Sequence, residues 1–282
     1  MFSKRFHKIH EQLVHIEDKN NEMIGILRDY LALDLRDRAI HIEDKINILI
    51  DAARSYEVID HPDQMFGGRT FSQHGDDLIV ACLFYSLGIE KPSYLDIGAH
   101  HPTIISNTAL LYKRGCRGIN VEPNPNLFTS FTTMRPDDIN LNIGVADKSG
   151  KLFFYMIDDY SGRNTFDYET ACRFCKDNPQ FNIRETREID VLTINDIVAR
   201  YADGYPDFLS IDVEGLDESI IDSADFTKSK PKIICVEVIN AMEDSSSMNR
   251  IRKKLEDRGY TSVIRAASNL ILVENKYVHK VR

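Results

Sequence analysis

The stretch Tyr94-Leu95-Asp96-Ile97-Gly98-Ala99-His100-His101-Pro102 decides how the rest of the chain is interpreted. An apolar segment that ends in Asp-x-Gly is typical of a buried strand running into a glycine turn. In open α/β folds such turns lie at the carboxyl edge of the sheet, where ligands bind. Asp96 and Gly98 are therefore candidate binding residues.

Short apolar runs alternate with helical patterns on both sides of this turn, which predicts a doubly wound, mostly parallel sheet. Only a few residues join the last two runs, so these two strands are expected to be antiparallel. Seven strands are predicted, at Ser93–Ile97, Gly118–Glu122, Asn140–Val145, Phe208–Val213, Lys232–Val238, Thr261–Ile264 and Asn269–Val273, with further extended pieces at Lys151–Ile157 and Glu188–Leu192. Helices are predicted at Asp76–Leu87, Ile104–Lys113, Leu127–Met134, Ile194–Ala202 and Ser247–Arg258.

The pattern before His61-Pro62 is different, so residues 1–60 are predicted to form a helical extension and residues 61–282 the α/β domain. An apolar stripe with three- and four-residue steps runs from Ile9 to Leu49. A narrow stripe on a charged helix normally packs against another helix. We therefore expect self-association, in a coiled-coil-like homo-oligomer, through this extension.

The composition limits the classes of partner. The 282 residues carry a formal net charge of −9. No basic cluster offsets it, so a phosphate backbone would be repelled and nucleic acid is not an expected partner. The N-terminus lacks the apolar core of a secretory signal, and no apolar run is long enough to span a membrane. The cytoplasm is the expected compartment.

A second candidate site residue lies at the end of the second strand. Glu122, followed by Pro123, comes twenty-four residues after Gly98. A carboxylate there can accept hydrogen bonds from both hydroxyls of an adenosine ribose. A dinucleotide would require G-x-G-x-x-G, because the backbone must approach a pyrophosphate. Here Ala99, His100 and His101 follow Gly98, which favours S-adenosylmethionine, whose ammonium group Asp96 would suit.

Three further carboxylates, Asp212, Glu214 and Glu237, follow the fourth and fifth strands. They are expected at the same edge as the glycine turn, where they could activate an acceptor, hold it, or bind a hard divalent cation. Methyl transfer to a hydroxyl needs a group that removes a proton. Asp212 is the first candidate, with His100, His101 and Glu214 as further catalytic candidates. No separate metal-binding motif accompanies the acids, so a metal remains an open alternative.

The chain resembles the FkbM-type methyltransferases in several segments that occur in family order. They are FSQHGDD (71–77), YLDIGAHHP (94–102), NVEPNP (120–125), IGVA (143–146), IDVLTINDIV (189–198) and FLSIDVEGLDESII (208–221). The resemblance implies a class I (Rossmann-like) methyltransferase fold, S-adenosylmethionine as donor, and O-methylation of a sugar or another polar hydroxyl compound. A carbohydrate or nucleotide-sugar acceptor in surface polysaccharide biosynthesis is the leading hypothesis.

The resemblance also implies roles for individual residues. The cofactor-binding set it suggests, together with the residues found above, is Gln73, Asp96, Gly98, Ala99, Glu122, Pro123, Val145, Ala146 and Asp212. The acceptor is expected to contact Asn164, Thr165 and Glu237, and the segment 161–187 is a candidate lid. Two alternatives stay open: N-methylation of a small amine, and a non-catalytic Rossmann-like interaction protein.

Overall fold

The computed structural model describes residues 70–213, 215–238 and 245–281. The predicted extension at 1–60, with its apolar stripe and its role in self-association, lies outside the described residues, as does Glu214. Among the described residues, no helix is long and apolar enough to cross a bilayer.

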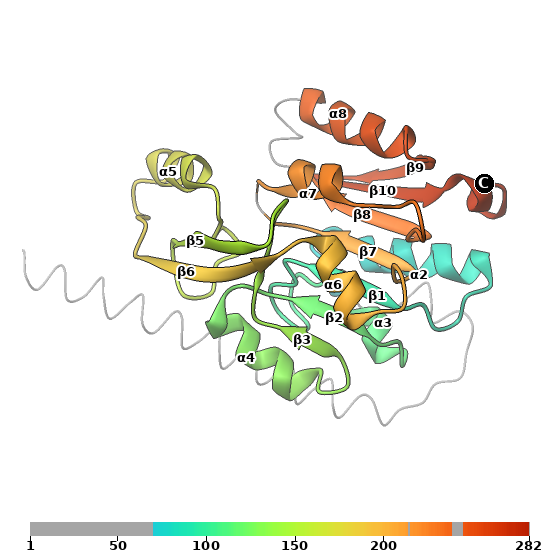
Figure 1. The fold of residues 1–282 in the computed structure, drawn as a ribbon, viewed down its shortest axis with the longest axis horizontal. Helices are drawn as coiled ribbons and strands as arrows, with labels where there is room; N and C mark the ends of the chain where they lie inside the picture. The colour runs from blue at the N-terminus through green and yellow to red at the C-terminus, as the bar shows by residue number, and fades with distance from the viewer. Residues whose placement is uncertain (1–69, 214, 239–244, 282) are drawn as a thin grey trace, which may run out of the picture. The chain divides into compact units, whose positions relative to one another are not determined.

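A seven-stranded sheet forms the centre of the α/β domain, in the order β3-β2-β1-β7-β8-β10-β9 (Figure 1). The strands are β1 (Tyr94–Ile97), β2 (Gly118–Val121), β3 (Ile139–Leu141), β7 (Phe208–Ile211), β8 (Ile233–Glu237), β9 (Tyr260–Ala266) and β10 (Asn269–Glu274). The first five in this order pair in parallel, and β10 is antiparallel to both β8 and β9. The expected class I architecture is confirmed, with the glycine turn at the centre of the carboxyl edge.

Apolar side chains that alternate along the central strands create a core on each face of this sheet. Leu95 and Ile97 of β1 belong to one cluster, whereas Tyr94 belongs to the other. The first cluster packs under α6 (Ile194–Tyr201), α7 (Asp217–Ser223) and α8 (Ser245–Glu256). The second packs under α2 (Asp76–Leu87), α3 (Ala109–Lys113) and the 3₁₀ helix η2 (Asn275–Lys280).

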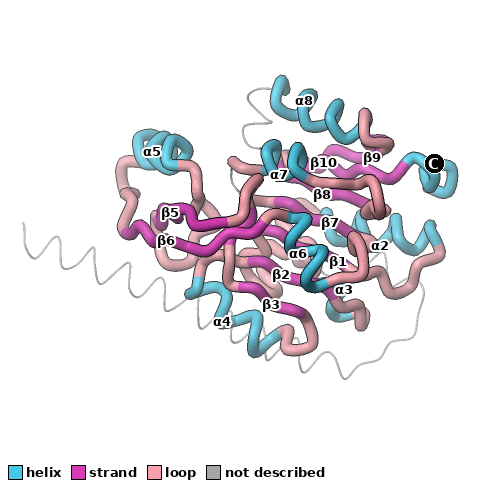
Figure 2. The backbone as a smooth tube through the Cα atoms, in the orientation of Figure 1, coloured by secondary structure: helices cyan, strands magenta, loops and turns pink. Residues whose placement is uncertain are grey.

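A second, three-stranded sheet stands beside the main one (Figure 2). It contains β4 (Gly144–Val145), β5 (Gly150–Met156) and β6 (Glu185–Leu192), in the order β4-β6-β5. The single strand expected at Asn140–Val145 is therefore wrong. The Asn142 side chain donates hydrogen bonds to the carbonyl oxygens of Glu122 and Pro123, at 2.8 and 3.1 Å. These bonds hold the chain between the two sheets, and it enters the second sheet at Gly144.

The helix expected at Ile104–Lys113 is shorter than predicted, because α3 begins only at Ala109. Ile105 has a φ of 50°, a left-handed conformation that a helix excludes.

Two of the described α-helices were not predicted: α7, and α5 (Tyr168–Asp177) within the candidate lid. The Asp167 side chain caps α5 by accepting a hydrogen bond from Glu169 N at 3.0 Å. The helix after β2, α4 (Pro125–Met134), begins two residues earlier than expected.

Candidate active site

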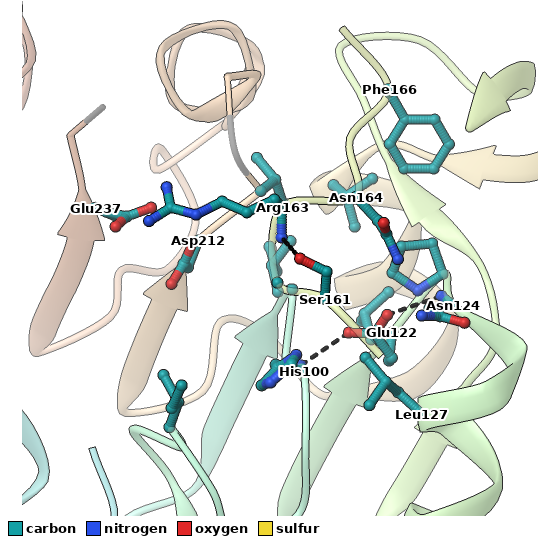
Figure 3. A pocket seen from close by; sticks show the side chains of 18 of the residues that line it. His100, Glu122, Asn124, Leu127, Ser161, Arg163, Asn164, Phe166, Asp212 and Glu237 are labelled. Atoms are coloured by element: carbon teal, nitrogen blue, oxygen red, sulfur yellow. Dashed lines mark hydrogen bonds between the residues drawn. The ribbon is translucent and has the colours of Figure 1, made fainter. Parts of the chain in front are cut away.

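A cavity of about 540 Å³ opens at the carboxyl edge of the main sheet, within the size range of small-molecule sites. Its wall combines the ends of β1, β2, β7 and β8, the segment just before α2, and the loop between β5 and α5 (Figure 3). Of the predicted site residues, it includes Gln73, Gly98, His100, Glu122, Pro123, Val145, Asn164, Asp212 and Glu237. Most of the expected residues are thus brought together around one cavity.

Gly98 lies at the cavity floor, where the ends of β1, β2 and β7 come into close contact. Its φ is 76°, and a Cβ atom there would lie 1.7 Å from the carbonyl oxygen of Asp212. The N–H groups of Gly98 and Ala99 both donate to the carbonyl oxygen of Val121, at 3.0 and 3.1 Å. Only glycine permits this close approach. Ala99 is buried and does not line the cavity, so it contributes through its backbone.

Glu122 is buried at the end of β2, with its carboxylate at the cavity wall. Its Oε2 accepts a hydrogen bond from His100 N at 2.8 Å, and its Oε1 accepts one from Asn124 N at 2.7 Å (Figure 3). Burial raises the pKa of Glu122 to about 8, against the opposing effect of the two N–H donors. Each oxygen retains a second lone pair, so both can still accept hydrogen bonds from a ligand.

Asp96 lies away from the cavity, contrary to the expected direct contact with the cofactor. Its position on β1 alternates with Leu95 and Ile97, so its side chain points to the other face of the sheet. Oδ2 accepts a hydrogen bond from Thr108 Oγ1 at 2.6 Å, and the carboxylate also contacts Ser210. Burial raises the pKa of Asp96. Asp96 therefore stabilises the glycine turn from the other face of the sheet.

A buried polar network continues from Asp96. Arg135, only 1% exposed, donates hydrogen bonds to Thr108 Oγ1 and Asn120 Oδ1, each at 2.8 Å. Its Nη1 also lies 4.0 Å from the buried carboxylate of Asp138. The network connects β1, β2 and the segment before α3. It contains no cavity-lining residue, so its contribution to the site is to hold the strand ends in place.

The two adjacent histidines have different environments. His101 is buried and does not line the cavity, and its Nδ1 accepts the N–H groups of Thr103 and Ile104, each at 3.2 Å. In this placement the ring stabilises the turn after β1, and the catalytic role of His101 stays a prediction that the cavity lining does not support. His100 lines the cavity, and within the described part of the chain its buried Nδ1 has no hydrogen-bond partner. Burial lowers the pKa of His100.

Asp212 and Glu237 line the end of the cavity opposite Glu122, at the ends of two neighbouring strands. The register pairs Ile211 with Val236, so the next residue of each strand is Asp212 and Glu237. Glu237 Oε1 accepts a hydrogen bond from Ser268 Oγ at 3.3 Å, whereas its buried Oε2 has no hydrogen-bond partner among the residues that the structure describes. The guanidinium of Arg163 extends from the overlying loop toward this end (Figure 3).

The expected acceptor contacts in the loop after β5 are only partly supported. Asn164 lines the cavity, but its amide donates to Asp158 O and accepts from Ile157 N, both at 2.8 Å, and so shapes the loop. Thr165 is fully buried away from the cavity, and its Oγ1 accepts a hydrogen bond from Asp167 N at 3.0 Å. Thr165 therefore does not belong to the described cavity wall, and its contact with the acceptor stays a prediction.

The last predicted cofactor residues lie after the third strand. Val145 lines the cavity, but Ala146 is buried outside it and donates its N–H to Leu192 O at 3.1 Å. Phe166 also lines the cavity and was missed. A Cβ at Gly144 would lie 2.4 Å from the Phe166 ring, so the bare glycine makes room for it. The cavity wall also contains residues that were not predicted as site residues, among them His74, Ile105, Asn124, Leu127 and Arg163.

No described set of three or more His, Cys, Asp or Glu side chains is arranged to hold a metal ion. The candidate metal set contained Glu214, which lies outside the described residues. A metal role for Asp212 and Glu237 has no support in the described part of the site.

The model of the methyltransferase FkbM domain matches residues 96–262, more than half of the chain. The chain belongs to the FkbM methyltransferase family. This family confirms the expected class of enzyme, a methyltransferase. No curated protein matches the chain.

Two solved structures of methyltransferases show limited similarity. The FkbM methyltransferase of Methylobacillus flagellatus KT is 16% identical, with a TM-score of 0.39 over 65% of this chain. The match spans 44% of that chain, less than half of its length. Precorrin-6y C5,15-methyltransferase from Geobacter metallireducens GS-15 is 12% identical, with a TM-score of 0.33 over 68% of this chain and 84% of the other.

Proposed function

We propose that this FkbM-family protein is an S-adenosylmethionine-dependent O-methyltransferase that acts on a hydroxyl group of a carbohydrate or nucleotide-sugar. The observation that carries the proposal is the division of one cavity into two chemically different ends. Glu122 and apolar residues form one end, and Asp212, Glu237 and Arg163 form the other. A role in cytoplasmic polysaccharide biosynthesis and a homo-oligomer assembled through the extension remain predictions.

The first end fits an adenosyl group. The apolar side chains of Leu127, Ile143 and Phe166 can cover a planar base, and Glu122 retains acceptor capacity on both oxygens for the ribose hydroxyls. Gly98 keeps the floor free of side-chain atoms. When bound, S-adenosylmethionine supplies a methyl group on a cationic sulfonium.

The second end fits a polar acceptor. The buried Oε2 of Glu237 has no partner among the described residues, which is costly unless a ligand donates a hydrogen bond to it, and an acceptor hydroxyl is such a donor. Asp212, on the adjacent strand end, is placed to accept the proton of the hydroxyl that is methylated. Arg163 supplies donors for acceptor oxygen atoms. This combination of carboxylates with a guanidinium is suited to a polyhydroxyl compound.

Calorimetric titration with S-adenosylhomocysteine and, separately, with NAD tests the cofactor. We expect S-adenosylhomocysteine alone to bind, because the turn after Gly98 lacks the other glycines that a pyrophosphate requires. A screen of sugars and nucleotide-sugars with labelled S-adenosylmethionine then tests the acceptor class. Binding of NAD alone would refute the assigned cofactor, and methylation confined to amines would refute O-methylation.

The affinity for S-adenosylhomocysteine should depend on pH through Glu122. The pKa of this group is about 8 in the folded protein, and hydroxyl donors of a ribose favour the ionised form. Affinity should therefore rise from pH 6 toward pH 8, by up to about tenfold per unit, and then level off. In the absence of ligand, the stability of the folded protein depends on the pH through Glu122 with the opposite sign. The folded state keeps a proton that the unfolded state loses, so Glu122 contributes less to stability as pH rises through 8.

Glu122→Gln is the control for this pH dependence. It should lower the affinity at pH 8 by about 10- to 100-fold, because charge-assisted hydrogen bonds are lost. The variant should also show almost no pH slope between pH 6 and 8. Titrations of both proteins at pH 6, 7 and 8 measure both effects. An equal slope in the variant would show that another group titrates.

A further inference from the structure

His100 occupies the centre of the candidate site in a backbone conformation that its side chain does not require. Its φ is 52°, in the left-handed region that glycine and asparagine adopt most easily. Residues held in this region cluster at ligand sites, where the surrounding structure imposes them. Histidine is one of the few side chains enriched in this conformation, and here it presents its imidazole at the candidate site.

The imidazole is an unused hydrogen-bond acceptor. Its Nδ1 is buried with no hydrogen-bond partner in residues 70–213, 215–238 and 245–281, which costs free energy until a ligand donor reaches it. Burial lowers the pKa of His100, so the ring is neutral near pH 7 and one of its nitrogens can accept a hydrogen bond. His101 provides the contrast, since two backbone N–H groups already occupy its Nδ1.

His100 lies between the two ends of the cavity. Its backbone N–H donates to Glu122, and the strand order places the end of β1 between those of β2 and β7. Figure 3 accordingly shows the ring between Glu122 and Asp212. Gly162 lies over the ring, because a Cβ atom there would be 3.9 Å from both Cε1 and Nδ1. His100 thus lines the cavity with its Nδ1 beneath the overlying loop, so a donor reaches this nitrogen where Gly162 leaves room.

The amino group of the cofactor needs an acceptor in this region. Asp96, the residue first expected to receive it, points away from the cavity and is bonded to Thr108. In an adenosyl ligand whose ribose is held by Glu122, the amino acid group is only a few bonds away, within reach of the next strand end. That strand end carries His100.

We propose that His100 Nδ1 accepts a hydrogen bond from the ammonium group in the methionine portion of S-adenosylmethionine. This inference rests on the proposed function, because it assumes an adenosyl ligand. It assigns His100 to cofactor binding, which leaves removal of the acceptor proton to Asp212.

His100→Gly tests the inference, because glycine keeps the backbone conformation and removes the ring. Calorimetric titration would compare three probes with the unmodified protein and the variant. S-adenosylhomocysteine carries both the amino and carboxylate groups, 5′-(3-aminopropylthio)-5′-deoxyadenosine carries only the amino group, and 5′-methylthioadenosine carries neither. We expect the variant to bind the first two about 10- to 100-fold more weakly and to bind methylthioadenosine unchanged.

Several results would overturn this assignment. An equal loss for all three probes would mean that the ring supports the nucleoside end, and no loss for any probe would remove the contact. A loss for S-adenosylhomocysteine alone would point to the carboxylate as the partner. If glycine loosens the turn, visible as a lower melting temperature, His100→Asn repeats the comparison with a side chain suited to this conformation. Failure of the unmodified protein to bind S-adenosylhomocysteine would instead refute the proposed function itself.

Discussion

Replacing Asp212 with asparagine is expected to lower methyl transfer about 100- to 10,000-fold, the usual contribution of a positioned general base. Asparagine keeps the size of the side chain but cannot take up the acceptor proton. Because the ribose end of the cavity is unchanged, the affinity for S-adenosylhomocysteine should stay within a few-fold. Turnover with an acceptor found by screening, measured together with calorimetric binding, separates the two effects.

Asp207→Asn is the matched control for this substitution. Asp207 precedes β7 at the opposite end of the same strand, where it accepts a hydrogen bond from Ser93 N at 2.9 Å and pairs with Lys232. It does not line the cavity, so its replacement should leave turnover unchanged while the protein remains folded. Equal losses in the two variants would show that the effect of Asp212 is structural, and full activity of Asp212→Asn would refute its role as a base.

Replacing Arg135 with methionine is expected to lower the free energy of unfolding by about 3–5 kcal/mol, as when one partner of a buried ionic network is removed. The guanidinium donates to Thr108, Asn120 and Ser106, and it is the positive charge beside Asp138. Methionine fills part of the volume but leaves these acceptors without their donors. Urea unfolding at constant m-value measures the loss.

Arg117→Met is a suitable control, because both arginines lie over the Tyr112 ring. The Cζ atoms of Arg117 and Arg135 are 4.5 and 5.4 Å from its centroid. The salt bridge of Arg117 with Asp137 is solvent-exposed, however, with side-chain exposures of 43% and 60%. Its loss should cost about 1 kcal/mol or less. Similar losses in the two variants would contradict the importance assigned to the buried network.

The strands of the main sheet could be predicted from sequence because each is a short apolar run bounded by turn residues. The direction of a side chain at a strand end was harder to predict. Asp96 and Glu122 both end apolar strands, yet Asp96 faces the side of the sheet that carries α2 and α3, whereas Glu122 faces the cavity. The alternation of Tyr94, Leu95 and Ile97 contained this information, since the two faces of β1 carry different clusters.

Other parts of the site depend on contacts between distant residues, which no local pattern reveals. Arg135 follows a helix end in an ordinary loop sequence, and the three side chains to which its guanidinium donates hydrogen bonds lie fifteen or more residues away. The roles of the two adjacent histidines differ because one ring meets the backbone of its own turn and the other faces the cavity. The break at Asn142 depends on carbonyl groups that follow β2, about twenty residues earlier in the chain.

The separation of the two sheets has a consequence for how this enzyme could diversify. The floor of the cavity belongs to the main sheet, whereas Ser161, Gly162 and Arg163 belong to a connection carried by the small sheet. Substitutions or insertions between β5 and α5 can therefore remodel the roof without disturbing the two hydrophobic cores. Selection for a new acceptor could therefore change this connection alone and leave the cavity floor, which the main sheet forms, intact.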